Sequence, residues 1–298
     1  MEKHTIKSMK SWSAKDNVKS RAKRGKGTSA PDKKTLDIEK RLFKIAQGSK
    51  GKVRTLILGA TPEIRDLALS LNSETVAVDI SPRLLLALTN VMKYKDDENN
   101  KFMVGDWLKL HKFLDKNSFD IVLSDISINN LPYDLWDDFF KSLSYVMKKN
   151  AYYIPRHMVF NYPVETRTCE EVIEEFRENN NSVFEMIADL ALGTDVVREG
   201  YDHKKKSMSW IPLKKYDKKM RKFLDKEEYL FFANMLKHGK DLTTVIISEK
   251  EFLKKISKYF DLKARKAVGT IGNTYRLPVY VFKNKKNMFS NIFRRLRK

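Results

Sequence analysis

The sequence predicts a doubly wound α/β fold with a seven-stranded, mostly parallel sheet, an antiparallel last strand and a helical insertion. Three observations lead to this prediction. Short β-branched runs alternate with segments of helical apolar spacing over residues 53–160, which is typical of parallel strands covered by helices on both faces. Two further strand-like runs near the C-terminus are joined only by residues 269–275, too short a connection for a helical crossover, so we expect them to pair antiparallel. Residues 162–250 separate the fifth run from the helix before this pair and form the insertion.

The first expected element is a helix over residues 30–47, because Ser29 to Asp32 has the form of a capping box. Pro155 lies inside the fifth strand run and indicates a bulge or an early end, since proline cannot donate to a sheet ladder. Strands are expected at residues 53–58, 75–78, 102–104, 119–123, 151–160, 260–268 and 276–282. The helices between them are expected at residues 63–71, from Ser81-Pro82 onward, at 133–147 and at 251–259.

The chain of 298 residues has room for one large domain or two small ones. The changes in composition divide it into an N-terminal arm, an α/β domain that the insertion interrupts, and a tail. We place the basic flexible arm at 1–28, the first part of the α/β domain at 29–161, the mostly helical insertion at 162–250, the second part of the domain at 251–283 and the basic tail at 284–298.

The formal net charge of +21 is unevenly distributed along the chain. Residues 1–54 carry 17 basic against 5 acidic side chains, and residues 283–298 carry 7 basic and no acidic ones. A third segment, residues 203–226, has ten basic side chains against two acidic ones. These segments could bind a nucleic acid or an anionic surface, or they could be ordinary solvated lysine, and the sequence leaves both interpretations open.

Cysteine usage and hydropathy exclude several classes of protein. The single cysteine, Cys169, cannot form an internal disulfide framework or a multi-cysteine zinc cluster, which favours a reducing compartment and no metal site. No apolar run approaches the roughly 18 residues of a membrane span, and the lysine-rich first residues lack the apolar core of a secretory signal. We therefore expect a cytoplasmic protein without a transmembrane segment.

A glycine or an acidic residue follows four of the expected strands. Gly59 ends the first strand, Asp79 ends the second, Asp106 follows the third, and Asp125 follows the fourth. In an open α/β sheet, ligands bind beyond the carboxyl ends of the strands, so these residues should meet at one edge. The 20 residues from Gly59 to Asp79 match the interval between a glycine turn and a carboxylate that binds ribose hydroxyls. The first turn has no G-x-G-x-x-G pattern, which argues against a nicotinamide-binding domain.

This order of motifs resembles the class I S-adenosylmethionine-dependent methyltransferases, which have a Rossmann-like sheet. The resemblance covers about residues 53–160, and the pair of strands over residues 260–282 matches the antiparallel last strand of such enzymes. Those enzymes usually have further glycines where this chain has Thr61 and Glu63, and the run Gly-Ala-Thr-Pro-Glu resembles one branch of the family. The resemblance implies S-adenosylmethionine as the cofactor. It implies the following cofactor-binding residues: Gly59, Ala60, Thr61, Asp79, Ile80, Asp106, Trp107 and Asp125.

The methyl group of such a cofactor is already activated, so the enzyme mainly has to hold a nucleophile in line. A base is needed only where the acceptor enters protonated. Four residues are candidates for catalysis: Asp125 lies beside the methyl group by resemblance, Asn130 or Tyr133 could orient a substrate, and His157 could act as a base. The aromatic side chains among the lysines of the insertion suit either stacked bases and phosphates or an ordinary lid.

The sequence therefore predicts a methyltransferase whose acceptor is a small molecule or an RNA. The alternative is a non-catalytic module of the same fold that binds RNA or a protein partner through its basic segments. A polyamine synthase on this fold is disfavoured, because its substrate is cationic and the patches of this protein are cationic too.

Overall fold

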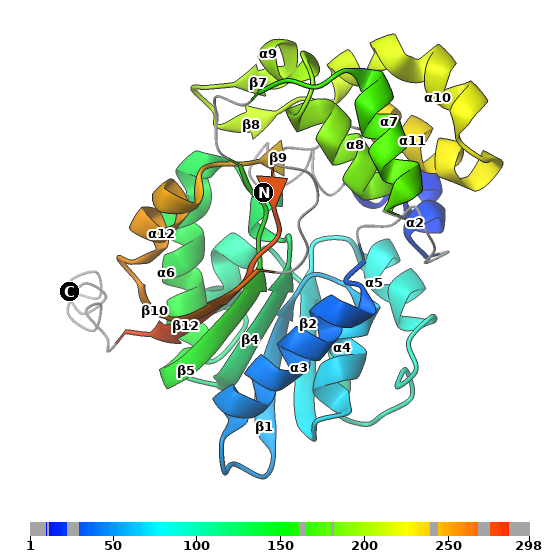
Figure 1. Ribbon diagram of the computed structural model, residues 1–298. Helices are drawn as coiled ribbons and strands as arrows, with labels where there is room; N and C mark the ends of the chain where they lie inside the picture. The colour runs from blue at the N-terminus through cyan, green and yellow to red at the C-terminus, as the bar shows by residue number, and fades with distance from the viewer. Residues whose placement is uncertain are drawn as a thin grey trace.

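The computed structural model describes residues 10, 12–22, 30–160, 165–179, 182–238, 244–267 and 275–285. Seven strands form one sheet in the order β10-β12-β5-β4-β1-β2-β3 (Figure 1). The strands are β1 (Val53–Leu58), β2 (Ser73–Asp79), β3 (Asn100–Val104), β4 (Phe119–Asp125), β5 (Met147–Arg156), β10 (Phe260–Lys266) and β12 (Val279–Asn284). Strands β1 to β5 are parallel to one another, whereas β12 runs antiparallel to both of its neighbours, β5 and β10. The predicted fold class is confirmed.

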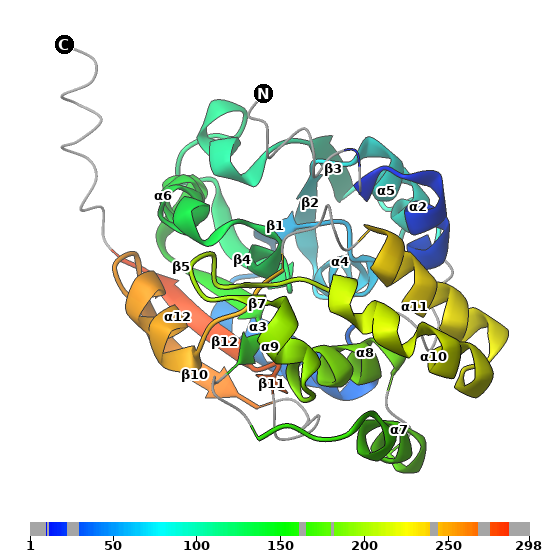
Figure 2. The ribbon, with the colours of Figure 1, turned by 90° about the horizontal axis from the view of Figure 1, so that it is seen from above.

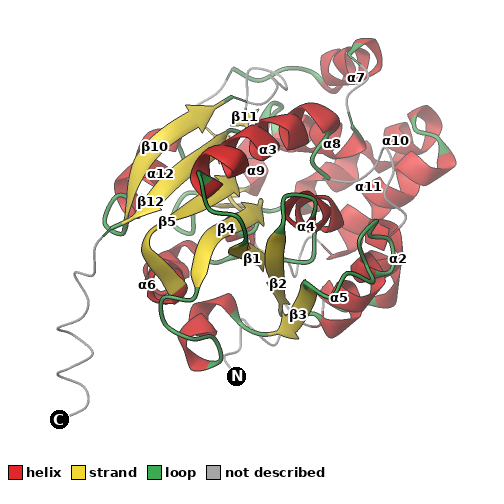
Figure 3. Cartoon of the chain, turned by 90° about the horizontal axis from the view of Figure 1, so that it is seen from below, coloured by secondary structure: helices red, strands yellow, loops and turns green. Residues whose placement is uncertain are grey.

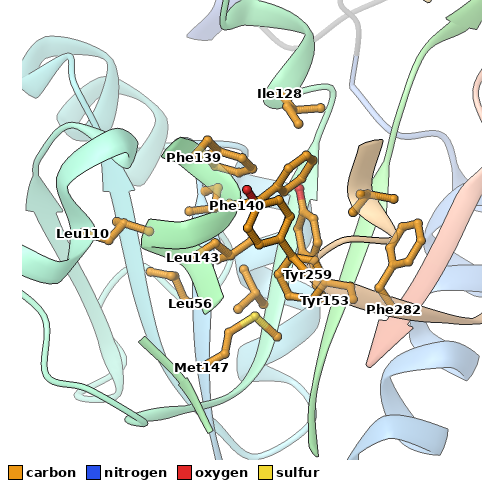
Figure 4. Close-up of a cluster of buried hydrophobic side chains, with 14 of the residues drawn as sticks. Leu56, Leu110, Ile128, Phe139, Phe140, Leu143, Met147, Tyr153, Tyr259 and Phe282 are labelled. Atoms are coloured by element: carbon orange, nitrogen blue, oxygen red, sulfur yellow. The ribbon is translucent and has the colours of Figure 1, made fainter. Parts of the chain in front are cut away.

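Helices cover both faces of this sheet (Figure 3). One face packs against α3 (Lys33–Gln47), α4 (Pro62–Leu69) and α5 (Pro82–Thr89). The other face packs against α6 (Trp136–Val146), α12 (Glu249–Ile256) and the 3-10 helix η1 (Trp107–Lys112). Neighbouring residues of β1 point to opposite faces, so Ile57 belongs to the first core and Leu56 to the second. Figure 4 shows the second core, in which Leu56 and Tyr153 of the sheet pack against Phe140 and Leu143 of α6.

Two helix starts differ from the sequence prediction. Helix α3 begins at Lys33 rather than at residue 30, because the carboxylate of Asp32 accepts the Thr35 N–H at 2.7 Å and is the N-cap. The helix predicted over residues 133–147 begins as a 3-10 turn, η3 (Tyr133–Leu135), and becomes α-helical at Trp136. The predicted cap at Ser81 is confirmed, since its hydroxyl accepts the Leu84 N–H at 3.1 Å.

Two predicted strands are each split in two. The run over residues 151–160 leaves the main sheet after Arg156 and resumes as β6 (Val159–Phe160), and the run over 276–282 is divided into β11 (Tyr275–Arg276) and β12. Strands β6 and β11 pair antiparallel as a separate two-stranded sheet. Pro155 stays within β5, which ends at Arg156, and the His157 N–H then donates to the carbonyl of Pro278, the residue just before β12.

The insertion is a largely helical layer above the strand ends of the sheet (Figures 1 and 2). It contains α7 (Cys169–Glu178), α8 (Val183–Leu192), α9 (Val196–Gly200), the 3-10 helix η4 (Ile211–Tyr216), α10 (Asp217–Phe223) and α11 (Lys226–His238). A small antiparallel sheet of β7 (Tyr201–Asp202), β8 (Ser207–Met208) and β9 (Thr244–Val245) completes it. These elements share a hydrophobic core of their own, in which α8 is buried along its whole length.

An N-terminal helix, α2 (Lys15–Ala22), lies between α5 of the α/β layer and α11 of the insertion (Figure 1). The sequence placed these residues in a flexible arm, whereas Trp12, Val18 and Ala22 pack against the core that α4 and α5 cover. The basic tail beyond residue 285 lies outside the described residues. Among the described residues, no helix is long and apolar enough to cross a membrane.

Candidate active site

The turn after β1 is shaped by Gly59. Its φ of +111° lies in a region that side-chain-bearing residues rarely adopt, and its N–H donates to the Val78 carbonyl of β2 at 2.8 Å. A Cβ at this position would lie 3.6 Å from Ser127 Oγ, 3.9 Å from the Trp107 ring and 4.0 Å from Asp79 Oδ2. The glycine therefore faces, at close range, a hollow bordered by residues from three other strand ends.

Asp79 ends β2 and is 7% exposed. Its Oδ1 accepts the Ser81 N–H at 2.8 Å, which fixes the carboxylate at the start of α5. Burial raises the pKa of Asp79 to about 6, against the opposing effects of the Ser81 N–H and the Arg21 charge. The carboxylate is thus held ready to accept further hydrogen bonds, and its charge is sensitive to mild acid.

Asp106 and Trp107 follow β3 and begin η1. The Asp106 carboxylate accepts the Leu108 N–H at 3.0 Å and caps this 3-10 helix. The Trp107 indole N–H donates to the Val78 carbonyl at 2.7 Å, which fixes the ring beside the end of β2. Both residues therefore have a local structural role and also border the same hollow as Gly59.

Asp125, at the end of β4, forms a buried ion pair with Arg156 at the end of β5. Asp125 Oδ1 lies 2.5 Å from Arg156 Nε, and both side chains are less than a tenth exposed. Glu39 of α3 belongs to the same buried group of charges, and its Oε2 has no hydrogen-bond partner. Burial, aided by the Asp125 charge and opposed by Arg156, raises the pKa of Glu39 to about 8. With Glu39 neutral, Arg156 balances Asp125 and the group carries no net charge.

These strand ends open into a pocket that the insertion covers. The side of the pocket away from the acids is apolar, with Met158 from the chain after β5, Phe184 from α8, Trp210 before η4, and Phe231 from α11. Trp210 is fixed by a hydrogen bond from its indole N–H to Thr244 Oγ1 at 3.0 Å. One continuous pocket therefore has an acidic side on the sheet and an apolar side on the insertion.

The buried side-chain amide of Asn129 connects the sheet side of the pocket to the insertion side. Asn129 Nδ2 donates to the carbonyls of Met158 at 3.0 Å and Val245 at 2.7 Å, and Asn129 Oδ1 accepts the Met158 N–H at 3.1 Å. Asn129 lies in the 3-10 turn η2 (Ile128–Asn130) that follows β4. Because its bonds reach the chain after β5 and strand β9, Asn129 sets the spacing between the strand ends and the insertion.

The structure brings together most of the residues singled out in the sequence. The following predicted residues line the pocket: Gly59, Ala60, Thr61, Asp79, Ile80, Asp106, Trp107, Asp125 and Asn130.

Tyr133 and His157 do not line the pocket. Tyr133 donates its hydroxyl to Glu251 of α12 at 2.8 Å. His157 is fully buried and stacks on Phe252 at 4.0 Å between ring centroids, and both of its ring nitrogens lack a partner. Burial lowers the pKa of His157 to about 3, so the buried ring stays neutral at ordinary pH. Neither side chain lines the pocket, and we assign neither a part in the reaction.

Several residues around the pocket had no signal in the sequence. Trp12 and Arg21 come from the N-terminal segment, and Ser127, which donates its hydroxyl to the Leu58 carbonyl at 2.6 Å, faces Gly59. Arg156 is a basic residue in an apolar strand run, and that contrast could have marked it as the partner of an acid. The other residues reach the pocket only through contacts between distant parts of the chain.

A family model described as a methyltransferase domain matches residues 60–229, more than half of the chain. The chain belongs to this family, and the class predicted from the strand-end motifs, a class I S-adenosylmethionine-dependent methyltransferase, is confirmed. No curated protein matches the sequence.

Solved structures share the fold at low sequence identity. The PH0226 protein of Pyrococcus horikoshii is 16% identical, with a TM-score of 0.51, over 87% of this chain and 94% of that one. A Rhodobacter sphaeroides protein named for zinc-dependent alcohol dehydrogenases is 12% identical, with a TM-score of 0.58, over 96% of this chain and all of that one. Phosphoethanolamine N-methyltransferase 2 of Haemonchus contortus, solved with S-adenosylmethionine, is 14% identical, with a TM-score of 0.51, over 96% of this chain and 61% of that one.

Proposed function

We propose that this protein transfers the methyl group of S-adenosylmethionine to a small, largely apolar acceptor bound between the strand ends and the insertion. The observation that carries the proposal is the single pocket that joins Gly59, Asp79 and Asp106 to the apolar side chains of the insertion. A site for the cofactor alone would not need the apolar side chains of the insertion. An acceptor site must adjoin the cofactor site for in-line transfer, and here the two halves are continuous.

The residues on the sheet side fit the cofactor. The Asp79 carboxylate can accept two hydrogen bonds from a ribose diol, and Asp106 with the Trp107 ring suits an adenine. Thr61 makes no capping bond to α4, so its hydroxyl is available for the methionine end of the cofactor. When bound, S-adenosylmethionine supplies a methyl group activated by its sulfonium. The lack of a Cβ at Gly59 leaves the space that the cofactor needs between Asp79 and Ser127.

The residues on the insertion side suit an acceptor with an apolar or aromatic body. Phe184, Trp210, Phe231 and Met235 would enclose it and exclude water from the transfer. Asn130 lies where the two sides meet, with its amide N–H donating to the Ile126 carbonyl at 3.2 Å, and would orient the polar end of the acceptor.

The pocket offers little for general-base catalysis. Among the described residues that line it there is no histidine, cysteine, tyrosine or lysine, and Asp125 is held by Arg156. We infer that the acceptor atom attacks with a lone pair of its own, as a neutral amine does, and loses its proton after the transfer. The chain's contribution is then to bind, orient and dehydrate the two reactants.

Acids of the same protein partly neutralise the basic segment of the insertion, residues 203–226. Within residues 203–226, five of the ten basic side chains pair with acids of the same protein. They are Lys205, Lys206, Lys215, Lys219 and Arg221. We therefore propose no nucleic-acid partner for this segment.

The test is to incubate the full-length protein with methyl-labelled S-adenosylmethionine and a cell extract separated into small-molecule, protein and RNA fractions. We expect label in the small-molecule fraction, and mass spectrometry would identify the methylated compound. The variant Phe231→Ala, which shortens an apolar side chain on the acceptor side, should still bind S-adenosylhomocysteine and transfer the methyl group more slowly. Label confined to RNA or protein would refute the small acceptor, and no binding of S-adenosylhomocysteine to the unaltered protein would refute the enzyme itself.

A further inference from the structure

The N-terminal segment, residues 12–22, contacts both halves of the pocket. Helix α2 packs on α5 on one side and on α11 on the other (Figures 1 and 2). Leu84 and Leu88 of α5 and Phe231 and Met235 of α11 line the pocket. The segment therefore closes the gap between the wall that carries Asp79 and the wall that covers the acceptor side.

Two side chains of this segment form part of the pocket lining. Trp12 is half-buried, and the Arg21 guanidinium lies 4.3 Å from the centroid of its ring. Among the described lining residues, Arg21 is the one basic side chain, and its charge acts on Asp79. An aromatic ring and a cation thus line the same pocket as the acid that is suited to a ribose.

The segment is anchored at the residue that also positions Asp79. Ser13 Oγ lies 2.8 Å from Ser81 Oγ, and Arg83 donates to the Ser13 carbonyl at 3.3 Å. The Ser81 N–H donates in turn to the Asp79 carboxylate. Docking of the segment and the position of Asp79 therefore depend on the same residue.

We propose that residues 12–22 are a third wall of the cofactor site, in which Trp12 covers the adenosine bound by Asp79 and bound cofactor holds the segment against α5. This inference rests on the proposed function, because it takes the ligand at Asp79 to be the adenosine of the cofactor. Arg21 fixes the Trp12 ring by stacking on it, and its positive charge favours the ionised carboxylate that ribose hydroxyls need.

The first test measures the affinities for adenosine and S-adenosylhomocysteine by titration calorimetry. Trp12→Ala should raise both dissociation constants about tenfold, the loss of one aromatic stacking contact on a base, whereas Trp12→Phe should recover most of the affinity. Arg21→Gln should weaken both ligands and move the acid limb of binding to higher pH, because Asp79 loses a favourable charge. Lys222→Gln is the control: it removes the same charge from an exposed position of α10 that does not line the pocket, and it should change nothing.

The second test uses the unaltered protein and trypsin. Saturating S-adenosylhomocysteine should slow cleavage after Lys19 and Arg21, and homocysteine, which lacks the adenosine, should not. The proposal that residues 12–22 form a third wall is refuted if Trp12→Ala binds S-adenosylhomocysteine as tightly as the unaltered protein does. It is also refuted if trypsin cleaves the unaltered protein at the same rate with and without S-adenosylhomocysteine. If the unaltered protein binds neither adenosine nor S-adenosylhomocysteine, the proposed function itself fails.

Discussion

Cofactor affinity should depend on pH through Asp79. The ribose hydroxyls donate their hydrogens, so the ionised carboxylate binds them and the protonated one is a poorer partner. With burial raising the pKa of Asp79 to about 6, the carboxylate is almost fully ionised at pH 8, and about one molecule in eleven is ionised at pH 5. Since the apparent dissociation constant scales with the inverse of the competent fraction, it should rise about elevenfold between these two values.

Titration calorimetry of S-adenosylhomocysteine at half-unit steps from pH 5 to pH 8 would measure this dependence. Asp79→Asn is the matched variant, because it keeps the shape and removes the titrating group. We expect it to bind about tenfold or more weakly at pH 8, from the loss of about 1.5–3 kcal/mol in charge-assisted hydrogen bonds, and to show a flat profile. A dissociation constant in the unaltered protein that stays constant over this range would refute the reasoning. The reasoning would also fail if the dissociation constant of Asp79→Asn changed with pH as strongly as that of the unaltered protein.

Three further predictions concern the folded state around the pocket. Gly59→Ala should lower the free energy of unfolding by about 1–3 kcal/mol and weaken the binding of S-adenosylhomocysteine, because φ is +111° at this position. Gly51→Ala is the control: no atom lies within 4 Å of its added Cβ, so it should leave the free energy of unfolding unchanged in urea titrations. Glu39→Gln should have the same free energy of unfolding as the unaltered protein near pH 4.5 and an increasingly higher one up to pH 8. The reason is that Glu39 ionises in the unfolded chain over this range, whereas burial keeps it protonated in the folded protein. The difference should reach at most about 5 kcal/mol. Thermal melts at several pH values that run parallel for the two proteins would contradict this. His157→Leu should change the free energy of unfolding by less than about 1.5 kcal/mol and leave methyl transfer intact, so a folded variant without activity would restore His157 as a base.

The sequence alone determined the fold class and the sheet side of the site. Strand and helix periods are local properties, and consecutive parallel strands deliver their carboxyl ends to one edge, so the meeting of Gly59, Asp79 and Asp106 followed from their places after three strands. The antiparallel pair near the C-terminus followed equally from the short connection between its strands. Each of these inferences uses residues close together in the sequence.

Only the tertiary structure decided which side chains are accessible and which charges are paired. His157 is part of a strand run in the sequence, and its burial against Phe252 depends on a helix that lies almost a hundred residues further along the chain. Arg156 and Glu39 meet Asp125 from different elements, and Trp12 and Arg21 reach the pocket through a helix that packs on α5 and α11. Contacts of this kind arise from the packing of whole elements, which no local pattern of residues records, whereas strand ends are ordered by the chain itself.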